Sequence, residues 1–173
     1  MLKARGAELL TPPIDQGGEI CCFFRDPDGH LLEISEVALV STRSPAVVLD
    51  TNVFVAAAFR PESDSARVIA AIRQGRLRLI WHESTRRETE RLLRRIPPVS
   101  WEAVADLFQE RHRFTDDLHP GAYDSVPDPD DRKFAALAVV TGAILVSLDK
   151  HLLDAQCGDA LVVLNPSAFL ARR

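Results

Sequence analysis

The chain has 173 residues, of which 46% are hydrophobic and 27% are charged, which suits one globular domain with a short appendage. Its 25 acidic and 21 basic side chains give a net charge of −4, which argues against nucleic-acid binding through bulk basicity. The longest stretch without a charge, residues 134–148, has 15 residues, too few to span a bilayer. The start of the chain lacks the apolar core of a secretory signal, and the three cysteines form no disulfide or metal-binding pattern. We therefore expect a soluble, reduced protein of the cytoplasm.

The first 40 residues differ in pattern from the rest of the chain. Two apolar runs, residues 20–25 and 30–36, predict two strands. The sequence between them, Asp26-Pro27-Asp28-Gly29, favours a tight turn, because proline presets φ and glycine accepts a positive φ. Residues 41–45 have the composition of a linker. A short β-hairpin is therefore expected ahead of the main domain.

From residue 46 onward, short apolar runs alternate with segments of helical periodicity. We expect strands over residues 46–49, 77–81, 143–147 and 161–164, and helices over residues 65–74, 85–95, 101–111 and about 130–141. A loop rich in Asp, Pro and Gly is expected over residues 114–127. Alternation of this kind predicts an α/β fold in which a parallel sheet carries helices on both faces.

Acidic residues stand where this fold would bring side chains together. Asp50 follows the first of these strands, and Asp149 lies two residues after Ser147 at the end of a later strand. Glu88 and the group Asp128-Pro129-Asp130-Asp131 stand near the starts of two helices. Ligands gather outside the carboxyl ends of the strands in an open parallel sheet. We therefore expect these carboxylates to converge on one edge of the sheet.

Each acid also has a purely structural interpretation. Thr85 and Glu88 have the spacing of a capping box, Asp128 with Pro129 suits a helix start, and Asp50 could cap a following helix. Together, however, the acidic positions exceed what capping requires. Clustered carboxylates repel one another unless a cation is present, and oxygen ligands select Mg²⁺ or Mn²⁺. Such an ion can activate water for attack on a phosphate.

The sequence around these acids resembles PIN-domain nucleases over about residues 46–166. Four segments carry the resemblance in the family's order: Val47-Val48-Leu49-Asp50-Thr51-Asn52-Val53, Thr85-x-x-Glu88, Asp128-Pro129-Asp130-Asp131 running into Phe134-Ala135-Ala136-Leu137-Ala138, and residues 144–153. The resemblance implies a three-layer α/β/α domain with a mainly parallel sheet over residues 46–170. It also implies a metal-dependent endoribonuclease that cleaves single-stranded RNA. A VapC-like toxin of a toxin–antitoxin pair, with an antitoxin partner and a homodimeric assembly, is the implied role.

The same resemblance assigns the site residues. Asp50, Glu88, Asp131 and Asp149 would be catalytic metal ligands for Mg²⁺ or Mn²⁺, and Asn52 and Ser147 would hold the carboxylates or the attacking water. Ser147 stands where the family more often has threonine. Asp128 would be an additional ligand. Asp130 could take that place, but helical spacing sets Asp128 beside Asp131 and turns Asp130 away, so Asp128 is preferred.

Five arginines lie close to Glu88 in the sequence: Arg86, Arg87, Arg91, Arg94 and Arg95. They form either a solvated helix face with Arg/Glu pairs or a strip that binds phosphate. In the second interpretation, Arg87 and Arg91 are the candidates for substrate binding, because an arginine near a carboxylate cluster can guide a phosphate towards the metal.

The N-terminal segment resembles a different family. Residues 2–8 and 24–34 look like the C-terminal end of a glyoxalase-type, or vicinal oxygen chelate, domain, and Glu33 matches a metal ligand of that family. The partner ligands of that family are missing here. A lone hairpin is marginally stable in water, so residues 1–40 are predicted to be a non-catalytic fragment.

Two other functions stay open at this point. A non-catalytic, protein-binding module would use the acids only to cap helices. A phosphatase of similar sheet topology is the other: haloacid-dehalogenase-like enzymes also have an aspartate after the first strand, but that family has a second aspartate two residues later, where this chain has Asn52.

Overall fold

The computed structural model describes residues 8–11, 14–15, 19–37, 44–97, 99–155 and 160–172. The chain divides into two compact units, Met1–Arg43 and Ser44–Arg173, and this boundary falls within the predicted linker. Residues 2–7 of the glyoxalase-like sequence and residues 41–43 of the linker lie outside the described residues.

The N-terminal unit is an antiparallel sheet. Strands β3 (Glu19–Arg25) and β4 (Leu31–Val37) pair along their whole length, which confirms the predicted hairpin. Two short strands that were not predicted, β1 (Glu8–Leu9) and β2 (Ile14–Asp15), pair with the other side of β3.

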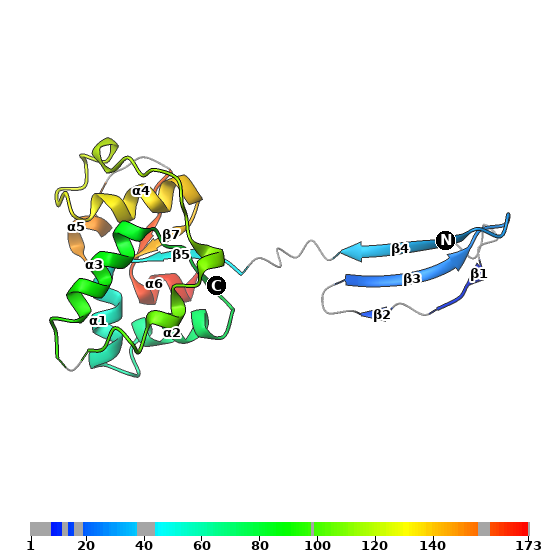
Figure 1. Cartoon of the computed structure of the whole chain (residues 1–173), viewed down its shortest axis with the longest axis horizontal. Coiled ribbons are helices and arrows are strands. Elements are labelled where there is room, and N and C mark those ends of the chain that lie inside the picture. Colours follow the sequence, from blue (N-terminus) through cyan, green and yellow to red (C-terminus); the bar gives the residue numbers. More distant parts are fainter. Residues whose placement is uncertain are drawn as a thin grey trace. The chain divides into compact units, whose positions relative to one another are not determined.

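The second unit is built on a parallel sheet of four strands in the order β6-β5-β7-β8 (Figure 1). The strands are β5 (Ala46–Leu49), β6 (Arg78–Leu79), β7 (Ile144–Val146) and β8 (Val163–Leu164). All three pairings are parallel, so the carboxyl ends of the strands lie at one edge. The predicted parallel sheet is therefore confirmed, although β6, β7 and β8 are shorter than expected.

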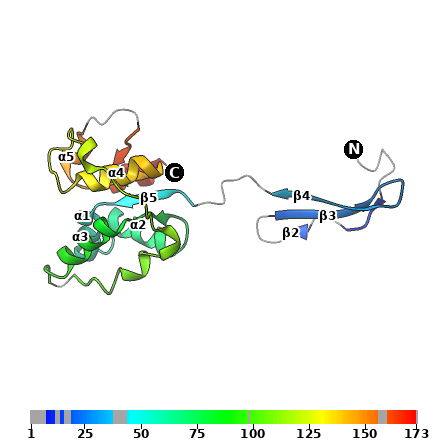
Figure 2. The ribbon, with the colours of Figure 1, turned by 45° about the horizontal axis from the view of Figure 1, so that its top comes forward.

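Helices cover both faces of this sheet. Their bounds are α1 (Thr51–Phe59), α2 (Asp64–Arg73), α3 (Glu83–Leu93), α4 (Arg132–Thr141), α5 (Lys150–Leu153) and α6 (Pro166–Ala171). Helix α4 lies on one side of β5, and α1 and α2 lie on the other (Figures 1 and 2). No helix in the described ranges is long and apolar enough to cross a membrane.

The alternation of side chains along β5 creates two hydrophobic cores. Val47 and Leu49 pack with the side chains of α1, α2 and α6, whereas Val48 packs with Phe134 of α4. Successive side chains of a strand point to opposite faces, so the central strand is buried on both sides. This is the predicted α/β/α arrangement, and the predicted fold class is confirmed.

Helix α1 was not predicted. Its sequence, Thr-Asn-Val-Phe-Val-Ala-Ala-Ala-Phe, is apolar on most sides and therefore lacks the periodicity of an amphipathic helix. Thr51, Val53 and Phe54 are buried, and Val53 and Phe54 belong to the core between the sheet and α2. The helix therefore depends on tertiary packing rather than on a local pattern.

The prediction of a helix over residues 101–111 is wrong. This stretch forms two short 3₁₀ turns, Ala105–Leu107 and Glu110–His112, and a third, Pro120–Ala122, lies in the loop that follows. The ring of Phe108 lies 5.0 Å from that of Trp101 and 5.8 Å from that of Phe54. The Trp81 indole donates to the Gln109 carbonyl at 2.9 Å. Packing of this aromatic cluster overrides the helical pattern.

Candidate metal centre

Asp50 lies directly after β5, at the carboxyl edge of the sheet. The residue is 5% exposed, and its backbone N–H donates to the Val146 carbonyl of β7 at 3.0 Å. Its carboxylate oxygen Oδ2 accepts from the Ser147 hydroxyl at 2.5 Å and from the Asn52 amide at 2.6 Å. Asp50 stands at the N-cap position of α1, and its backbone carbonyl accepts from the Val53 N–H at 3.1 Å, but its side chain makes no capping bond to the helix. Burial raises the pKa of this carboxyl.

Asn52 and Ser147 connect the end of β5 to the loop after β7. The Asn52 carbonyl oxygen accepts from the Leu148 N–H at 3.1 Å, and its amide also approaches the Ser147 hydroxyl at 3.4 Å. The Ser147 hydroxyl in turn accepts from the Asp149 N–H at 2.9 Å. The structure therefore brings both predicted supporting residues into contact with Asp50 and with the segment that carries Asp149.

Asp149 does act as a helix cap. Its Oδ1 accepts from the His151 N–H at 2.6 Å and from the Leu152 N–H at 3.4 Å, at the start of α5. Both bonds use the same oxygen, which leaves Oδ2 available for another ligand. Capping and metal binding are compatible here, because the cap fixes the carboxylate in one orientation.

Asp131 shows that the acidic side chains converge. Its pKa is raised to about 7, first by burial and then by the negative charges of Asp50, Asp128, Asp149 and Glu88. The side chain makes no capping bond to α4. Residues from four separate parts of the sequence therefore act on one carboxyl group, as the strand-end argument predicted.

Glu88 projects from α3, but not as part of a cap. Helix α3 begins at Glu83, two residues before the predicted start, and its capping box joins His82 and Thr85. The predicted capping box of Thr85 and Glu88 is therefore wrong. The Glu88 side chain is only 13% exposed and forms an ion pair with Lys133 of α4. Sequence reasoning missed Lys133, and the only local signal was its position two residues after Asp131.

Asp128 also differs from its predicted capping role. Helix α4 begins at Arg132, and the Asp128 carboxylate accepts from the Asp130 N–H at 2.8 Å within the preceding turn. The prediction that Asp128 caps the helix is therefore wrong. Its charge contributes to the raised pKa of Asp131. The Asp130 side chain is 80% exposed and lies 3.9 Å from the Lys133 ammonium. The choice of Asp128 over Asp130 as the additional ligand stays a prediction.

The arginines of α3 divide into two groups. Arg86 pairs with Glu83 at 3.1 Å and with Glu90 at 3.0 Å, and Arg94 pairs with Glu90 at 3.0 Å. These contacts agree with a solvated face of Arg/Glu pairs. A pocket of about 380 Å³ beside the acidic cluster is lined by Ser84, Arg87, Glu88, Arg91, Asp130 and Lys133. Among the described residues, Arg91 has no ion-pair partner, so it is available to an anion in this pocket.

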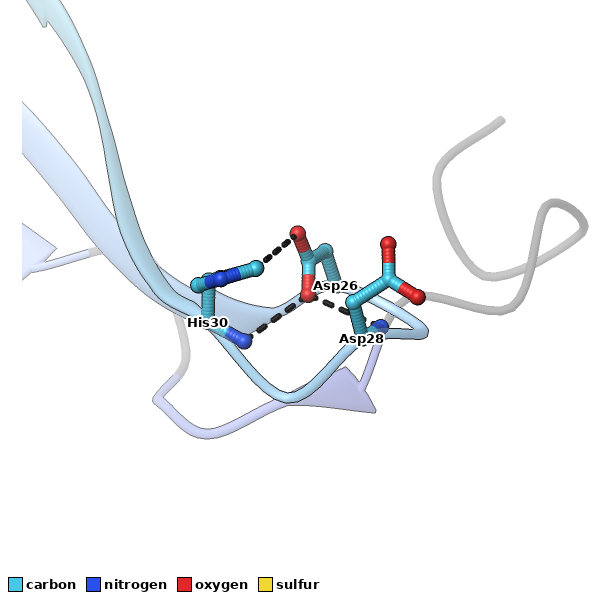
Figure 3. A group of neighbouring side chains, drawn as sticks. All are labelled: Asp26, Asp28 and His30. Atoms are coloured by element: carbon cyan, nitrogen blue, oxygen red, sulfur yellow. Dashed lines mark hydrogen bonds and ion pairs between the residues drawn. The ribbon is translucent and has the colours of Figure 1, made fainter.

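A second group of potential ligands lies in the N-terminal unit. Asp26, Asp28 and His30 bring one atom each within 4.8 Å of one another, and Figure 3 shows them around the tip of the hairpin. The Asp26 carboxylate accepts from the Asp28 N–H at 3.0 Å and from the His30 N–H at 2.8 Å. Gly29 has a φ of 89°. These bonds close the turn that the sequence predicted, and the His30 ring also contacts the Asp26 carboxylate at 3.0 Å. Glu33 is exposed and lies outside this group.

The predicted carboxylates have the donor chemistry of a hard divalent cation, although within the described residues no three of them bring ligand atoms within 4.8 Å of one another. They supply oxygen donors only, without histidine or cysteine, and a bound cation would compensate the negative charges that, after burial, raise the pKa of Asp131. A parallel sheet that holds such a cluster at its carboxyl edge defines an α/β domain with a candidate metal centre.

Comparison with known protein families identifies the family of this domain. The family model described as PIN domain matches residues 46–151, so the chain belongs to the PIN domain family. A comparison with curated proteins finds no match. One solved structure similar to this chain is the crystal structure of VapBC2 from Rickettsia felis bound to a DNA fragment from their promoter. The TM-score is 0.48 and the identity 13%, over 69% of this chain and 98% of that chain. The family match begins at Ala46, and the glyoxalase resemblance, which finds no support in these comparisons, stays a prediction.

Proposed function

We propose that the chain is a divalent-metal-dependent endoribonuclease that cleaves single-stranded RNA. The observation that carries the proposal is the setting of Asp131, whose pKa rises to about 7 first through burial and then through the negative charges of Asp50, Asp128, Asp149 and Glu88. Carboxylates that only capped helices would have no reason to repel one another at a shared point. Membership of the PIN domain family, whose members are generally nucleases, supports the same function.

In this proposal, Asp50, Glu88, Asp131 and Asp149 hold Mg²⁺ or Mn²⁺, with Asp128 as an additional ligand. The ion would supply a hydroxide nucleophile at neutral pH and neutralise charge on the attacked phosphate. Ser147 and Asn52 hold the Asp50 carboxylate in one orientation through their bonds to Oδ2. Fixing a ligand in this way reduces the reorganisation that binding would otherwise require.

Substrate binding is assigned to Arg87 and Arg91. Both line the pocket next to Glu88, and guanidinium groups bind phosphate oxygens through several N–H donors at once. Arg87 also pairs with Glu83 at 2.8 Å, whereas Arg91 has no such competitor in the described part of the chain. Arg91 is therefore the stronger candidate.

The proposal extends to the biological role. The resemblance in the sequence points to the toxin of a toxin–antitoxin pair, with an antitoxin protein as partner, a homodimeric assembly and a cytoplasmic location. Inducible expression in a bacterial host tests the toxin role. Growth arrest that disappears in the Asp50→Asn variant would support it, and unaffected growth in the presence of active enzyme would oppose it.

The other two functions explain less of the geometry. A purely structural role in helix capping does not account for the side chains of Asp50 and Glu88, because neither makes a side-chain capping bond. A phosphatase of the haloacid-dehalogenase type would need a second carboxylate where Asn52 instead donates its amide to Asp50.

A substrate panel tests the proposed reaction. Purified protein is incubated with single-stranded RNA, double-stranded RNA and single-stranded DNA of one sequence, with Mg²⁺ or Mn²⁺, with EDTA, and with metal restored after chelation. We expect internal cleavage of single-stranded RNA that stops with EDTA and returns with metal. Cleavage that persists in EDTA would refute metal dependence, and equal cleavage of all three substrates would refute the substrate class.

A further inference from the structure

Lys133 and Glu88 form an ion pair between two helices of the candidate metal centre. Lys133 lies in the first turn of α4 and Glu88 in the middle of α3, and their side chains are 16% and 13% exposed. Oxygen Oε2 of Glu88 is buried and has no hydrogen-bond partner among the described residues, and its ion-pair contact is the Lys133 ammonium. One oxygen of a predicted metal ligand is therefore enclosed against a protein cation.

The other cations near the cluster are placed differently. Arg87, in the same pocket, is 75% exposed. Lys150, which directly follows Asp149, is exposed and has no ion pair among the described residues. Burying a charged side chain away from water is costly unless the charge is paired. The burial of Lys133 therefore indicates a specific role beside Glu88, which an exposed lysine in contact with solvent would not have.

We propose that Lys133 is a built-in monovalent cation that holds Glu88 through Oε2 and limits the carboxylate cluster to one divalent ion. This inference rests on the proposed metal-dependent function. With Oε2 occupied by the ammonium, Glu88 can offer a metal only Oε1. In sites with two metals, the ions lie about 3.5–4 Å apart. A second divalent ion at Glu88 would stand against the Lys133 charge and would be repelled.

Lys133 is thus a positioning residue that acts through Glu88. Its role predicts a property that a merely structural lysine would not affect, namely the number of metal ions bound. Without the ammonium, Glu88 becomes an uncompensated, buried carboxylate beside Asp131, and a second divalent ion is the available replacement charge. An arginine at the same position retains the positive charge and should retain the limit of one ion.

Titration with Mn²⁺, followed by the electron paramagnetic resonance of free Mn²⁺ and by calorimetry, tests the inference. The proteins are the full chain and its variants Lys133→Met, Lys133→Arg and Lys150→Met. We expect one Mn²⁺ per chain for the parent, for Lys133→Arg and for the Lys150→Met control. Lys133→Met should bind two Mn²⁺ per chain, with the first bound roughly tenfold more tightly because a nearby positive charge is gone.

The outcomes separate this inference from the proposed function. A parent protein that binds no Mn²⁺ overturns the proposed metal dependence, and the inference with it. Two Mn²⁺ per parent chain, or the same stoichiometry and affinity in Lys133→Met as in the parent, overturns the role of Lys133 alone. Thermal melting of Lys133→Met gives a second readout: its melting temperature should fall in EDTA and recover with Mn²⁺. A fall that Mn²⁺ does not reverse identifies a purely structural lysine and overturns the inference.

Discussion

The Ser147 hydroxyl donates to the Asp50 carboxylate at 2.5 Å, although the two residues stand 97 positions apart in the sequence. Ser147 is fully buried, and its oxygen also accepts from the Asp149 backbone at 2.9 Å. One hydroxyl therefore connects the two strand ends that carry Asp50 and Asp149.

Replacing Ser147 tests this connection. Ser147→Ala should lower the rate of RNA cleavage by roughly tenfold to a hundredfold, since groups that orient metal ligands contribute at this level. It should also lower the free energy of unfolding by about 1 kcal/mol, because the part-buried Asp149 N–H loses its acceptor. Ser147→Thr retains the hydroxyl and serves as the matched control. Equal loss of activity in both variants would show that shape, and not the hydroxyl, matters.

The raised pKa of Asp131 predicts how the stability of the metal-free protein depends on pH. The folded state keeps this proton up to about pH 7, whereas the unfolded chain releases it near the ordinary value of 3.8. The folded state therefore binds more protons in this window, and stability falls as the pH rises through it. Above pH 7, the cost of the charged carboxylate is present in full.

Asp131→Asn should remove this part of the pH dependence. In EDTA, the variant should melt at a higher temperature than the parent at about pH 8 and close to the parent at about pH 4, below the window of the shift. Asp154→Asn, an exposed acid after α5, is the control and should follow the parent. Melting curves of Asp131→Asn that follow the parent at every pH would contradict the shift.

Arg91 in the last turn of α3 and Arg94 directly after the helix offer a matched pair. Arg91→Ala should raise KM for single-stranded RNA severalfold and leave kcat nearly unchanged, because a phosphate contact away from the reacting atoms contributes equally to ground and transition states. Arg94 is already paired with Glu90 and Glu102, so Arg94→Ala should leave KM unchanged. Steady-state kinetics at one ionic strength distinguish the two. An identical response of both variants would remove Arg91 from the binding site.

The N-terminal unit should be dispensable for catalysis. The PIN domain has hydrophobic cores of its own on both faces of its sheet, and the predicted site residues all belong to the unit Ser44–Arg173. A chain that begins at Ser44 should therefore cleave RNA at the rate of the full chain. Loss of activity with retained folding, measured by circular dichroism, would give the N-terminal unit a functional role.

Local sequence patterns predict some of these features, whereas others depend on contacts between residues that are distant in the sequence. Asp50 and Asp149 follow strands that local apolar runs reveal, so their convergence follows from the parallel topology alone. Helix α1 escaped prediction because its nearly continuous apolar sequence has no periodicity. The helix predicted over residues 101–111 does not form, because Phe108 packs against Trp101 and Phe54. Contacts between distant residues here override local helix propensity.

The pairing of Glu88 with Lys133 could not be derived in the same way. It depends on how closely α3 and α4 approach each other, and on a start of α3 two residues earlier than the pattern predicted. Because His82 and Thr85 form the capping box, Glu88 takes no part in capping the start of α3. A histidine cap is not among the residues that usually identify such a start.

The central claim is that Asp50 belongs to a carboxylate cluster that performs metal-dependent RNA cleavage. The most direct test is the cleavage rate of Asp50→Asn against Asp154→Asn, at saturating Mn²⁺ and with folding verified by circular dichroism. We expect Asp50→Asn to lose about two to three orders of magnitude in rate and the exposed control to match the parent. Full activity of Asp50→Asn, or equal loss in both variants, would contradict the account.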